Sequence, residues 1–217
     1  MLDMPLEEFM ALWTVGTWPQ RATGAFPSLE KSLEHICQRL TGRAILAEPI
    51  KQACRVWLDR TRETLTPREK TLDILQILRQ SGYKLGMMTD CSYETPYHWP
   101  GTPLSLAIDR AIFSCLVGMK KPDPRMYQLI CQELAIQPEQ CIYIGDGCGH
   151  ELTGAAAAGM YPVLLLAPCD ASSDSLRPDV EEWPGPRLSS FEDVLPFIEN
   201  MNGTLLQSGR VRTGVFQ

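Results

Sequence analysis

The sequence has no excess of basic residues and no apolar run long enough to cross a membrane. Its 20 Lys and Arg residues are outnumbered by 26 Asp and Glu, which gives a net charge of −6 at pH 7. That balance argues against a nucleic-acid partner and against binding to an anionic membrane surface. The first residues also lack the basic end and the apolar stretch of a signal peptide. We therefore predict a soluble cytoplasmic protein.

The sequence also lacks paired metal-binding cysteines. It has eight Cys, and none forms a Cys-x-x-Cys pair or a Cys/His spacing typical of a zinc site. Most lie in apolar surroundings and are predicted to be buried thiols. Cys91 and Cys148 differ because each follows a predicted strand. One interpretation is a catalytic thiol with His150 as its base, and the alternative is an incidental loop cysteine.

Hydrophobic periodicity divides the 217 residues into a helical first part and an alternating second part. In the first part the apolar positions recur at helical spacing, with one helix bounded by Ser28 and Gly42. Thr66-Pro67-Arg68-Glu69 resembles a capping box, so a helix is predicted to begin there. Helix and strand then alternate, which is typical of a parallel sheet covered by helices. The prediction is a helical domain over residues 1–65, an α/β core over 66–201 and a loose tail over 202–217.

The most informative stretch is a strand, an acidic turn and a helix. Cys141–Ile144 is predicted to be a buried strand, Gly145-Asp146-Gly147 ends it, and a helix rich in small residues runs on from Glu151. At the carboxyl edge of a parallel sheet, Asp146 and Glu151 would lie at the mouth of a ligand crevice. Two carboxylates there suit Mg²⁺, which keeps its other positions for water and substrate phosphate. A structural turn with an incidental Asp is the alternative.

Two further residues point to phosphate chemistry. Thr89 ends the predicted strand Lys84–Thr89, and its hydroxyl can donate to a phosphoryl oxygen without adding charge. Lys121 precedes Pro122-Asp123-Pro124, and these prolines keep it out of a helix interior. A lysine on such a rigid turn can act as a point charge on a phosphate. The structural alternatives are a turn residue for Thr89 and a solvated surface charge for Lys121.

Three motifs occur in an order that resembles the haloacid dehalogenase (HAD) superfamily: Thr89 after a strand, Lys121 before Pro-Asp-Pro, and Gly-Asp146 ahead of Glu151. The helical first part is similar to the cap of its phosphatase-like members. The resemblance covers the chain up to about Asn200. It implies a Rossmann-like, three-layer α/β/α core with a parallel sheet, and magnesium-dependent phosphoryl transfer through a covalent aspartyl phosphate.

The resemblance also implies a role for each matching residue. Thr89 would hold the transferred phosphoryl group, and Lys121 would stabilise it. Asp146 would bind Mg²⁺ directly or through water, and Glu151 would take the place of the second acidic residue that the family has in this motif. Asp90 stands in the phosphate site where many members carry Asn, which adds a negative charge beside the phosphate.

The family's first motif is absent from the sequence. It reads Asp-x-Asp-x-Thr or Val at the end of the first core strand, and Asp3 has neither a strand before it nor a second Asp two residues on. The nucleophile and the general acid are therefore missing, together with a central strand whose loss would open two sheet edges. Either upstream residues belong to the protein, or another segment fills the gap. Arg210–Phe216 is the spare strand-like stretch.

Three hypotheses for the function follow. The first is a magnesium-dependent phosphatase for a small organic phosphate, of which this chain is an N-terminally truncated and inactive form. The second is a non-catalytic relative that binds a phosphorylated ligand or a protein partner. The third is a haloacid dehalogenase proper, and the two acids of the predicted metal site argue against it because that reaction needs no magnesium.

Overall fold

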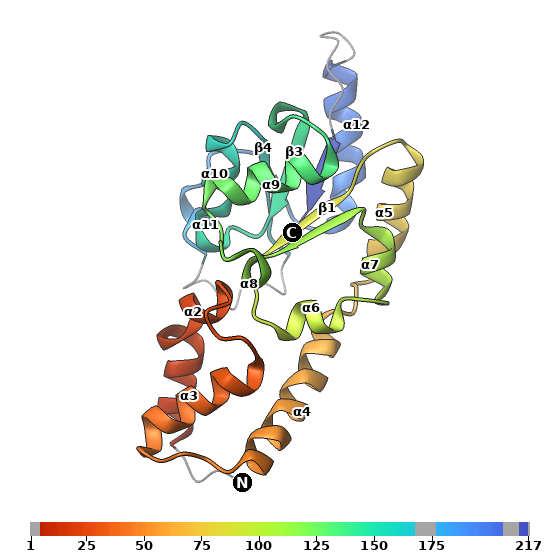
Figure 1. Ribbon diagram of the computed structural model, residues 1–217. Coiled ribbons are helices and arrows are strands. Elements are labelled where there is room, and N and C mark those ends of the chain that lie inside the picture. The colour runs from red at the N-terminus through yellow and green to blue at the C-terminus, as the bar shows by residue number, and fades with distance from the viewer. Residues whose placement is uncertain (1–4, 168–176, 206–212, 217) are drawn as a thin grey trace. The chain divides into compact units, whose positions relative to one another are not determined.

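The computed structural model describes residues 5–167, 177–205 and 213–216. Contacts divide the chain into two compact units, whose elements can be followed in Figure 1. The helical unit consists of Met1–Thr66, Asp90–Thr102 and Phe113–Lys120, and the α/β unit consists of Pro67–Thr89, Pro103–Ile112 and Lys121–Gln217. The predicted division at residue 65 left out the two later segments of the helical unit.

A six-stranded sheet forms the centre of the α/β unit, in the order β2-β1-β6-β3-β4-β5. Its strands are β1 (Gly86–Thr89), β2 (Arg110–Phe113), β3 (Cys141–Gly145), β4 (Tyr161–Leu165), β5 (Arg187–Leu188) and β6 (Thr213–Phe216). The pairs β1–β6, β6–β3, β3–β4 and β4–β5 are parallel. The parallel sheet predicted from the alternation of helix and strand is confirmed.

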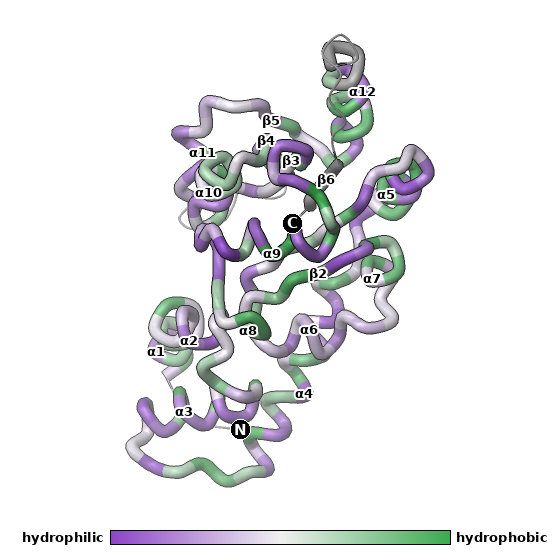
Figure 2. The backbone as a smooth tube through the Cα atoms, turned by 45° about the horizontal axis from the view of Figure 1, so that its top comes forward, coloured by the Kyte–Doolittle hydropathy of each residue, from purple (hydrophilic) through white to green (hydrophobic). Residues whose placement is uncertain are grey.

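Helices cover both faces of this sheet: α5 (Thr71–Gln80), α7 (Pro103–Ala107), α9 (Pro124–Leu134), α10 (Glu151–Ala157), α11 (Asp179–Glu182) and α12 (Val194–Leu205). Ile142 and Ile144 of β3 pack in one cluster with Leu75 of α5 and with α12. Tyr143 meets Tyr127 of α9 instead, with ring centroids 5.7 Å apart. Hydropathy alternates along α5 in Figure 2, as expected for a helix with one buried face. Successive side chains of β3 therefore pack against helices on opposite faces of the sheet, which gives the core three layers.

The central position of the sheet is filled by β6. This strand pairs with Gly86 and Met87 of β1 on one side and with Cys141–Ile144 of β3 on the other. The prediction of a loose tail over residues 202–217 is therefore wrong for β6, and also for the end of α12 at Leu205. An empty position between β1 and β3 would expose two unpaired sheet edges, and β6 closes both of them.

The start of α5 also differs from the prediction. The helix begins at Thr71, because Lys70 has a left-handed backbone (φ 62°) that interrupts helical geometry just before it. The preceding residues form a turn in which the Thr71 N–H donates to the Arg68 carbonyl at 3.1 Å. The predicted helix start at Thr66–Glu69 is therefore wrong.

The helical unit packs around its own core. Its elements are α1 (Leu6–Ala11), the π-helix η1 (Leu12–Gly16), α2 (Trp18–Ala22), α3 (Leu29–Thr41), α4 (Ala47–Thr64), α6 (Glu94–His98) and α8 (Ser114–Val117). Ser28 caps α3 and Gly42 ends it in a left-handed conformation, as the sequence predicts. Trp13 packs with α3 and α4, and its ring lies 4.3 Å from that of Trp57.

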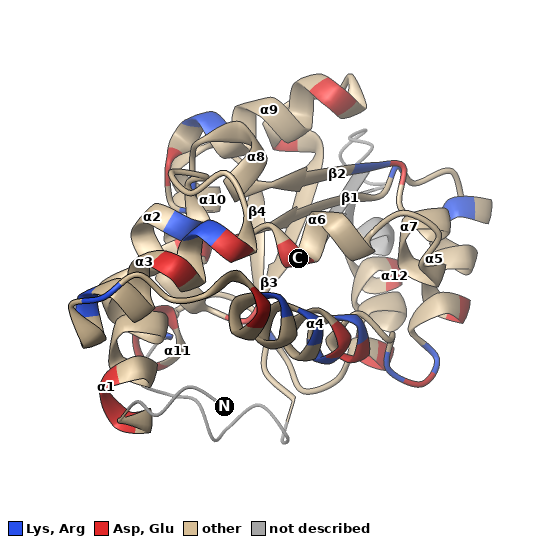
Figure 3. Ribbon diagram, turned by 60° about the horizontal axis from the view of Figure 1, so that its bottom comes forward, with Lys and Arg blue, Asp and Glu red and all other residues tan. Residues whose placement is uncertain are grey.

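Charges of both signs are mixed along α4, as Figure 3 shows. This arrangement is typical of a solvent-exposed helix face. Within the described part of the chain, no helix combines the length and the apolar character that crossing a bilayer requires.

Arg21 is buried inside the helical unit, with 4% of its surface exposed. Its guanidinium lies 3.7 Å from the centre of the Trp13 ring and donates to Thr17 Oγ1 at 3.3 Å, to Ser92 Oγ at 3.1 Å and to the Trp13 carbonyl. Burial lowers the pKa of Arg21 to about 10, and the charge of Glu94 opposes this effect. Arg21 therefore joins the segment of Ser92 to the first helices and is neither a solvated side chain nor an open anion site.

Val215→Pro tests the central position of β6. Proline removes a backbone N–H and its ring disturbs the ladder, so the free energy of unfolding should fall by about 2 kcal/mol or more. Val215→Ile keeps the N–H and the β-branched shape and serves as the control. Urea unfolding followed by circular dichroism measures both variants. Equal midpoints for Val215→Pro and the wild type would show that β6 does not occupy the centre of the sheet.

Candidate functional site

The candidate site is built on the loop that joins β3 to α10. β3 is buried over its whole length and ends at Gly145. A Cβ atom at this position would lie 2.3 Å from Glu151 Oε1, so only glycine leaves room for the carboxylate. Gly147 has φ 84°, and a Cβ atom there would approach Val180 to 3.0 Å. The two glycines thus shape the loop that carries both predicted acids, Asp146 and Glu151.

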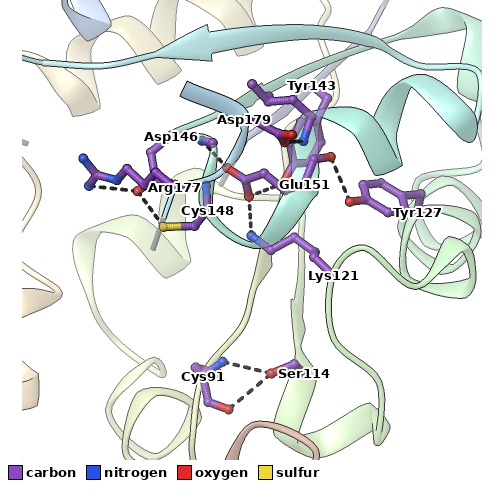
Figure 4. A network of polar contacts seen from close by, with 12 residues as sticks. Cys91, Ser114, Lys121, Tyr127, Tyr143, Asp146, Cys148, Glu151, Arg177 and Asp179 are labelled. Carbon is purple, nitrogen blue, oxygen red and sulfur yellow. Dashed lines mark hydrogen bonds and ion pairs between the residues drawn. The ribbon is translucent and has the colours of Figure 1, made fainter. Parts of the chain in front are cut away.

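A buried ion pair joins this loop to the turn before α9. Lys121 Nζ lies 2.6 Å from Glu151 Oε2, and the two side chains are 2% and 0% exposed. The Tyr143 hydroxyl donates to the same oxygen at 2.8 Å, and the Gly147 N–H donates to Oε1 at 3.0 Å (Figure 4). Burial raises the pKa of Glu151, and the Lys121 ammonium opposes that effect. Because all three donors point at carboxylate oxygens, the network holds Glu151 as an ion.

The small residues of α10 allow this helix to lie close to the same turn. The Tyr127 hydroxyl of α9 donates to the Glu151 carbonyl at 2.9 Å. A Cβ atom at Gly154 would lie 2.5 Å from the Tyr127 hydroxyl oxygen and 2.8 Å from Pro122. A larger residue at Gly154 would therefore push α10 away from Tyr127, which anchors the backbone of Glu151.

Asp146 is the more exposed of the two acids, with 31% of its side chain accessible. Its Oδ1 accepts a hydrogen bond from the Cys148 N–H at 3.0 Å, and its Oδ2 lies 3.1 Å from Arg177 Nη2. The Cys148 thiol also faces Oδ2, at 3.6 Å. Figure 4 shows Arg177 and Cys148 converging on this carboxylate. Asp146 thus carries its own cationic partner.

Asp179 of α11 completes the network. Its buried carboxylate accepts hydrogen bonds from the Leu152 N–H and the Thr153 hydroxyl, at 2.9 Å each, and so caps the first turn of α10. His150 Nδ1 lies 3.5 Å from Asp179 Oδ1, a longer contact made by a largely exposed ring. The capping carboxylate therefore comes from a different part of the chain and not from the residue that precedes the helix.

Sequence reasoning missed four residues of the site: Tyr127, Tyr143, Arg177 and Asp179. Tyr143 offered one signal, because a hydroxyl inside an otherwise apolar strand needs a buried partner. Arg177 and Asp179 lie in a stretch rich in Ser, Asp and Pro that is predicted to be a loop. Their partners lie 26 or more positions away, so no local pattern marks them.

Thr89 and the acidic loop follow different strands of the sheet. Thr89 ends β1, as predicted, and β6 separates β1 from β3, so the axes of these two strands are about 10 Å apart. Among the described residues, Thr89 makes no side-chain hydrogen bond to Lys121, Asp146 or Glu151. Asp90 follows directly and belongs to the helical unit. The phosphate-binding roles of Thr89 and Asp90 therefore stay predictions.

Of the two predicted metal ligands, Asp146 is accessible and Glu151 is buried. No three His, Cys, Asp or Glu side chains in this part of the chain are grouped so that they could hold a metal ion. Glu151 was predicted as the second acidic ligand, but its oxygens are buried and accept from protein donors, so its observed role is to hold Lys121 and the loop. Asp146 remains as one carboxylate that faces a guanidinium. Mg²⁺ takes one or two protein carboxylates and fills its other positions with water and phosphate, so the magnesium predicted at Asp146 stays a prediction.

The interpretation of Cys148 as a catalytic thiol does not match its surroundings. Burial, and then the charge of Asp146, raises the pKa of Cys148 to about 11, so the thiol is protonated at neutral pH. The nearby His150 contacts Asp179. Cys91 is buried in the helical unit, where its Sγ lies 3.9 Å from that of Cys115. Both cysteines match the alternative, a thiol without a catalytic role.

An acidic loop and a buried lysine at the carboxyl end of a parallel strand define an α/β protein of the class that binds ligands outside this edge of the sheet. The chain belongs to the haloacid dehalogenase-like hydrolase family, whose sequence model matches residues 6–159. The resemblance seen in the sequence is thereby confirmed.

Two curated relatives show how much of the chain is shared. A glyceraldehyde 3-phosphate phosphatase of Methanopyrus kandleri is 30% identical over 105 residues, which cover 46% of this chain and 44% of that protein. Acyl-CoA dehydrogenase family member 10 of Mus musculus is 32% identical over 96 residues, which cover 42% of this chain and 8% of that protein. The chain thus spans less than half the length of these relatives.

Solved structures share the fold at low sequence identity. A 2-haloacid dehalogenase from Pseudomonas syringae superposes with a TM-score of 0.62 at 14% identity and covers 92% of this chain and 83% of that chain. A HAD family enzyme of Bacteroides thetaiotaomicron, solved in complex with magnesium and inorganic phosphate, gives 0.55 at 16% identity over 73% and 78% of the two chains. These likenesses confirm the predicted Rossmann-like α/β core.

Removing one partner of the buried ion pair should destabilise the α/β unit strongly. Lys121→Ala leaves an uncompensated buried carboxylate, for which we expect a loss of about 3–5 kcal/mol in the free energy of unfolding. The double variant Lys121→Met with Glu151→Gln removes both charges and should lose less. Lys120→Ala is the matched control. Urea unfolding measures all three, and a Lys121→Ala midpoint equal to that of Lys120→Ala would rule out a buried pair.

Proposed function

We propose that this chain is the phosphate-handling part of a HAD-like phosphatase that acts on a small organic phosphate. The observation that carries the proposal is the buried Lys121–Glu151 pair beside Asp146, in a chain of a hydrolase family. A fixed ammonium near the carboxyl edge stabilises negative charge that collects on phosphoryl oxygens. Because water screens a buried charge poorly, Lys121 acts on an anion at this edge even though little of its side chain is exposed.

Thr89 would add a neutral donor to the phosphate site. It ends β1 and is half-buried. Its hydroxyl would donate to a phosphoryl oxygen. Asp90, the next residue, is still predicted to add a negative charge to this site. Tests of Thr89 therefore probe this site directly.

The relatives support phosphate as the ligand. The Methanopyrus kandleri protein is a glyceraldehyde 3-phosphate phosphatase, and the Bacteroides thetaiotaomicron enzyme was solved with inorganic phosphate. A small phosphorylated metabolite is therefore the substrate class that we assign. The magnesium implied by the resemblance stays a prediction, because among the described residues Asp146 is the one site acid that is not already buried in a protein network.

The covalent step needs a carboxylate nucleophile, and the 217 residues contain no Asp-x-Asp pair. We therefore expect the 217-residue chain to bind phosphate esters without turning them over. The same absence favours a second candidate, a non-catalytic relative that binds a phosphorylated ligand. The two candidates differ in whether a hydrophobic strand ending in Asp-x-Asp is encoded upstream of Met1.

Hydrolysis of p-nitrophenyl phosphate distinguishes the two candidates. The 217-residue chain should show no turnover, whereas a protein that includes an upstream Asp-x-Asp strand should hydrolyse the ester. In that longer protein, Thr89→Val should lower kcat by about tenfold to a hundredfold, because one donor to the transition state is lost, and Thr89→Ser should restore it. A stop codon directly upstream favours the non-catalytic candidate. Unchanged kcat in Thr89→Val would refute the role of Thr89.

A further inference from the structure

Two pairs of buried thiols lie in contact, one in each unit of the chain. In the helical unit, Cys91 Sγ lies 3.9 Å from Cys115 Sγ, and in the α/β unit, Cys131 Sγ lies 3.7 Å from Cys141 Sγ. All four residues are 5% exposed or less. Two sulfur atoms at this separation have to approach by roughly 2 Å to form a disulfide bond. Each pair is therefore a candidate site of oxidation.

The backbone holds Cys91 beside the residue that precedes Cys115. The Cys91 N–H donates to Ser114 Oγ at 2.9 Å, and the Ser114 hydroxyl donates to the Cys91 carbonyl at 3.2 Å (Figure 4). A Cβ atom at Gly24 would lie 2.1 Å from the Cys115 carbonyl oxygen, so Cys115 is also packed against the turn that follows α2. The fold thus brings together two thiols that lie 24 positions apart in the chain.

The two thiols of this pair differ in acidity. A hydrogen bond from Cys91 lowers the pKa of Cys115, and burial and the charge of Glu94 oppose that effect. The same hydrogen bond, together with burial, raises the pKa of Cys91. In thiol oxidation the thiolate is the nucleophile, and a neighbouring thiol then reacts with the oxidised sulfur. Cys115 is therefore suited to attack an oxidant, and Cys91 is suited to complete the disulfide.

The other described cysteines are less suited to oxidation. Cys141 is 0% exposed, and its thiol also donates to a backbone carbonyl at 3.4 Å. Cys37 and Cys54 lie in the apolar core of the helical unit, where burial raises the pKa of both thiols. Because an oxidant has to reach a thiolate, both kinds of surroundings slow the reaction. Cys91 and Cys115 combine sulfur contact, an acidic partner and a small exposed surface.

We propose that Cys91 and Cys115 form a reversible disulfide when the protein meets a hydroperoxide. The Cys115 thiolate attacks one peroxide oxygen, the O–O bond breaks, and the leaving hydroxide takes up the proton that Cys115 had lost, so Cys115 becomes a sulfenic acid. The Cys91 sulfur then bonds to the Cys115 sulfur, the S–O bond breaks, and water leaves with the Cys91 proton. The two thiols lose two electrons, and hydrogen peroxide is reduced to two molecules of water.

The disulfide would restrain the chain next to the predicted phosphate site. Cys91 directly follows Thr89 and Asp90, so a bond to α8 fixes the backbone that carries their side chains. This consequence rests on the proposed function, whereas formation of the disulfide does not. A dithiol reductant restores both thiols by exchange.

Peptide mapping of the native 217-residue chain by mass spectrometry tests the proposal. The reduced protein is treated with hydrogen peroxide, the remaining thiols are alkylated, and the protein is digested. We expect two peptides joined through Cys91 and Cys115, and separate peptides after treatment with dithiothreitol. A link between Cys131 and Cys141 should form about tenfold more slowly or not at all. Absence of the Cys91–Cys115 link, or a link that forms only in urea, overturns the inference whether or not the chain binds phosphate.

Serine variants test the order in which the two thiols react. Cys91→Ser lacks the second thiol and should accumulate a sulfenic acid at Cys115, which dimedone traps. Cys115→Ser should give about tenfold less dimedone adduct at Cys91, because that thiol is the less acidic of the two. Cys131→Ser is the matched control and should keep the Cys91–Cys115 link. Circular dichroism verifies the fold of each variant, and equal dimedone labelling in the first two contradicts the proposed reaction.

Discussion

The α/β unit depends on one buried ion pair, between Lys121 and Glu151. Either charge alone would be costly away from water, so each requires the other and the hydrogen bonds around them. Lys121 comes from the turn before α9, Glu151 from the first turn of α10, and Tyr143 from the strand between these helices. The pair therefore ties two helices to the end of β3. Gly145 is part of the same constraint, because a side chain there would occupy the space of the carboxylate.

A second set of contacts surrounds this pair and compensates the charges of the acidic loop. Asp179 caps α10, and Arg177 compensates Asp146, so the acidic loop is not an open cluster of carboxylates. Two cations and three carboxylates lie at this edge of the sheet, and each has a specific partner. They are Lys121, Arg177, Asp146, Glu151 and Asp179. Such a site attracts an anion better than a group of acids of the same size would, because its cations partly offset the repulsion. The proposed phosphate ligand depends on this compensation of charge.

Local patterns in the sequence were enough for the strand, turn and helix around Asp146, for the strand that ends at Thr89, and for the caps of α3. Each of these depends on neighbours in the chain. The start of α5 could not be predicted, because the left-handed backbone of Lys70 has no sequence signal. The place of β6 was offered only as one of two alternatives, with Arg210–Phe216 as the segment that could fill the gap. The sequence could not decide between them, because the four residues of β6 pair with strands about 70 and 130 positions away.

Glu151 shows why the candidate site could be predicted only in part. An acid at the start of a helix after Gly-Asp-Gly is compatible with a metal ligand and with a buried partner for lysine. Burial decides between the two, and it depends on Tyr143, Gly147 and the approach of α9, none of which the local pattern reveals. Arg177 was out of reach for the same reason, since its position depends on how α11 packs against the loop.

The state of the Lys121 ammonium is the most direct test of this account. Lys31 offers a matched reference, because its Nζ also lies 2.6 Å from a carboxylate oxygen, but its side chain is 58% exposed. Heteronuclear NMR of the side-chain ammonium groups should show a Lys121 signal with slow proton exchange and none of this protection for Lys31. Equally fast exchange at both lysines would mean that the Lys121–Glu151 pair is open to water, which contradicts the account.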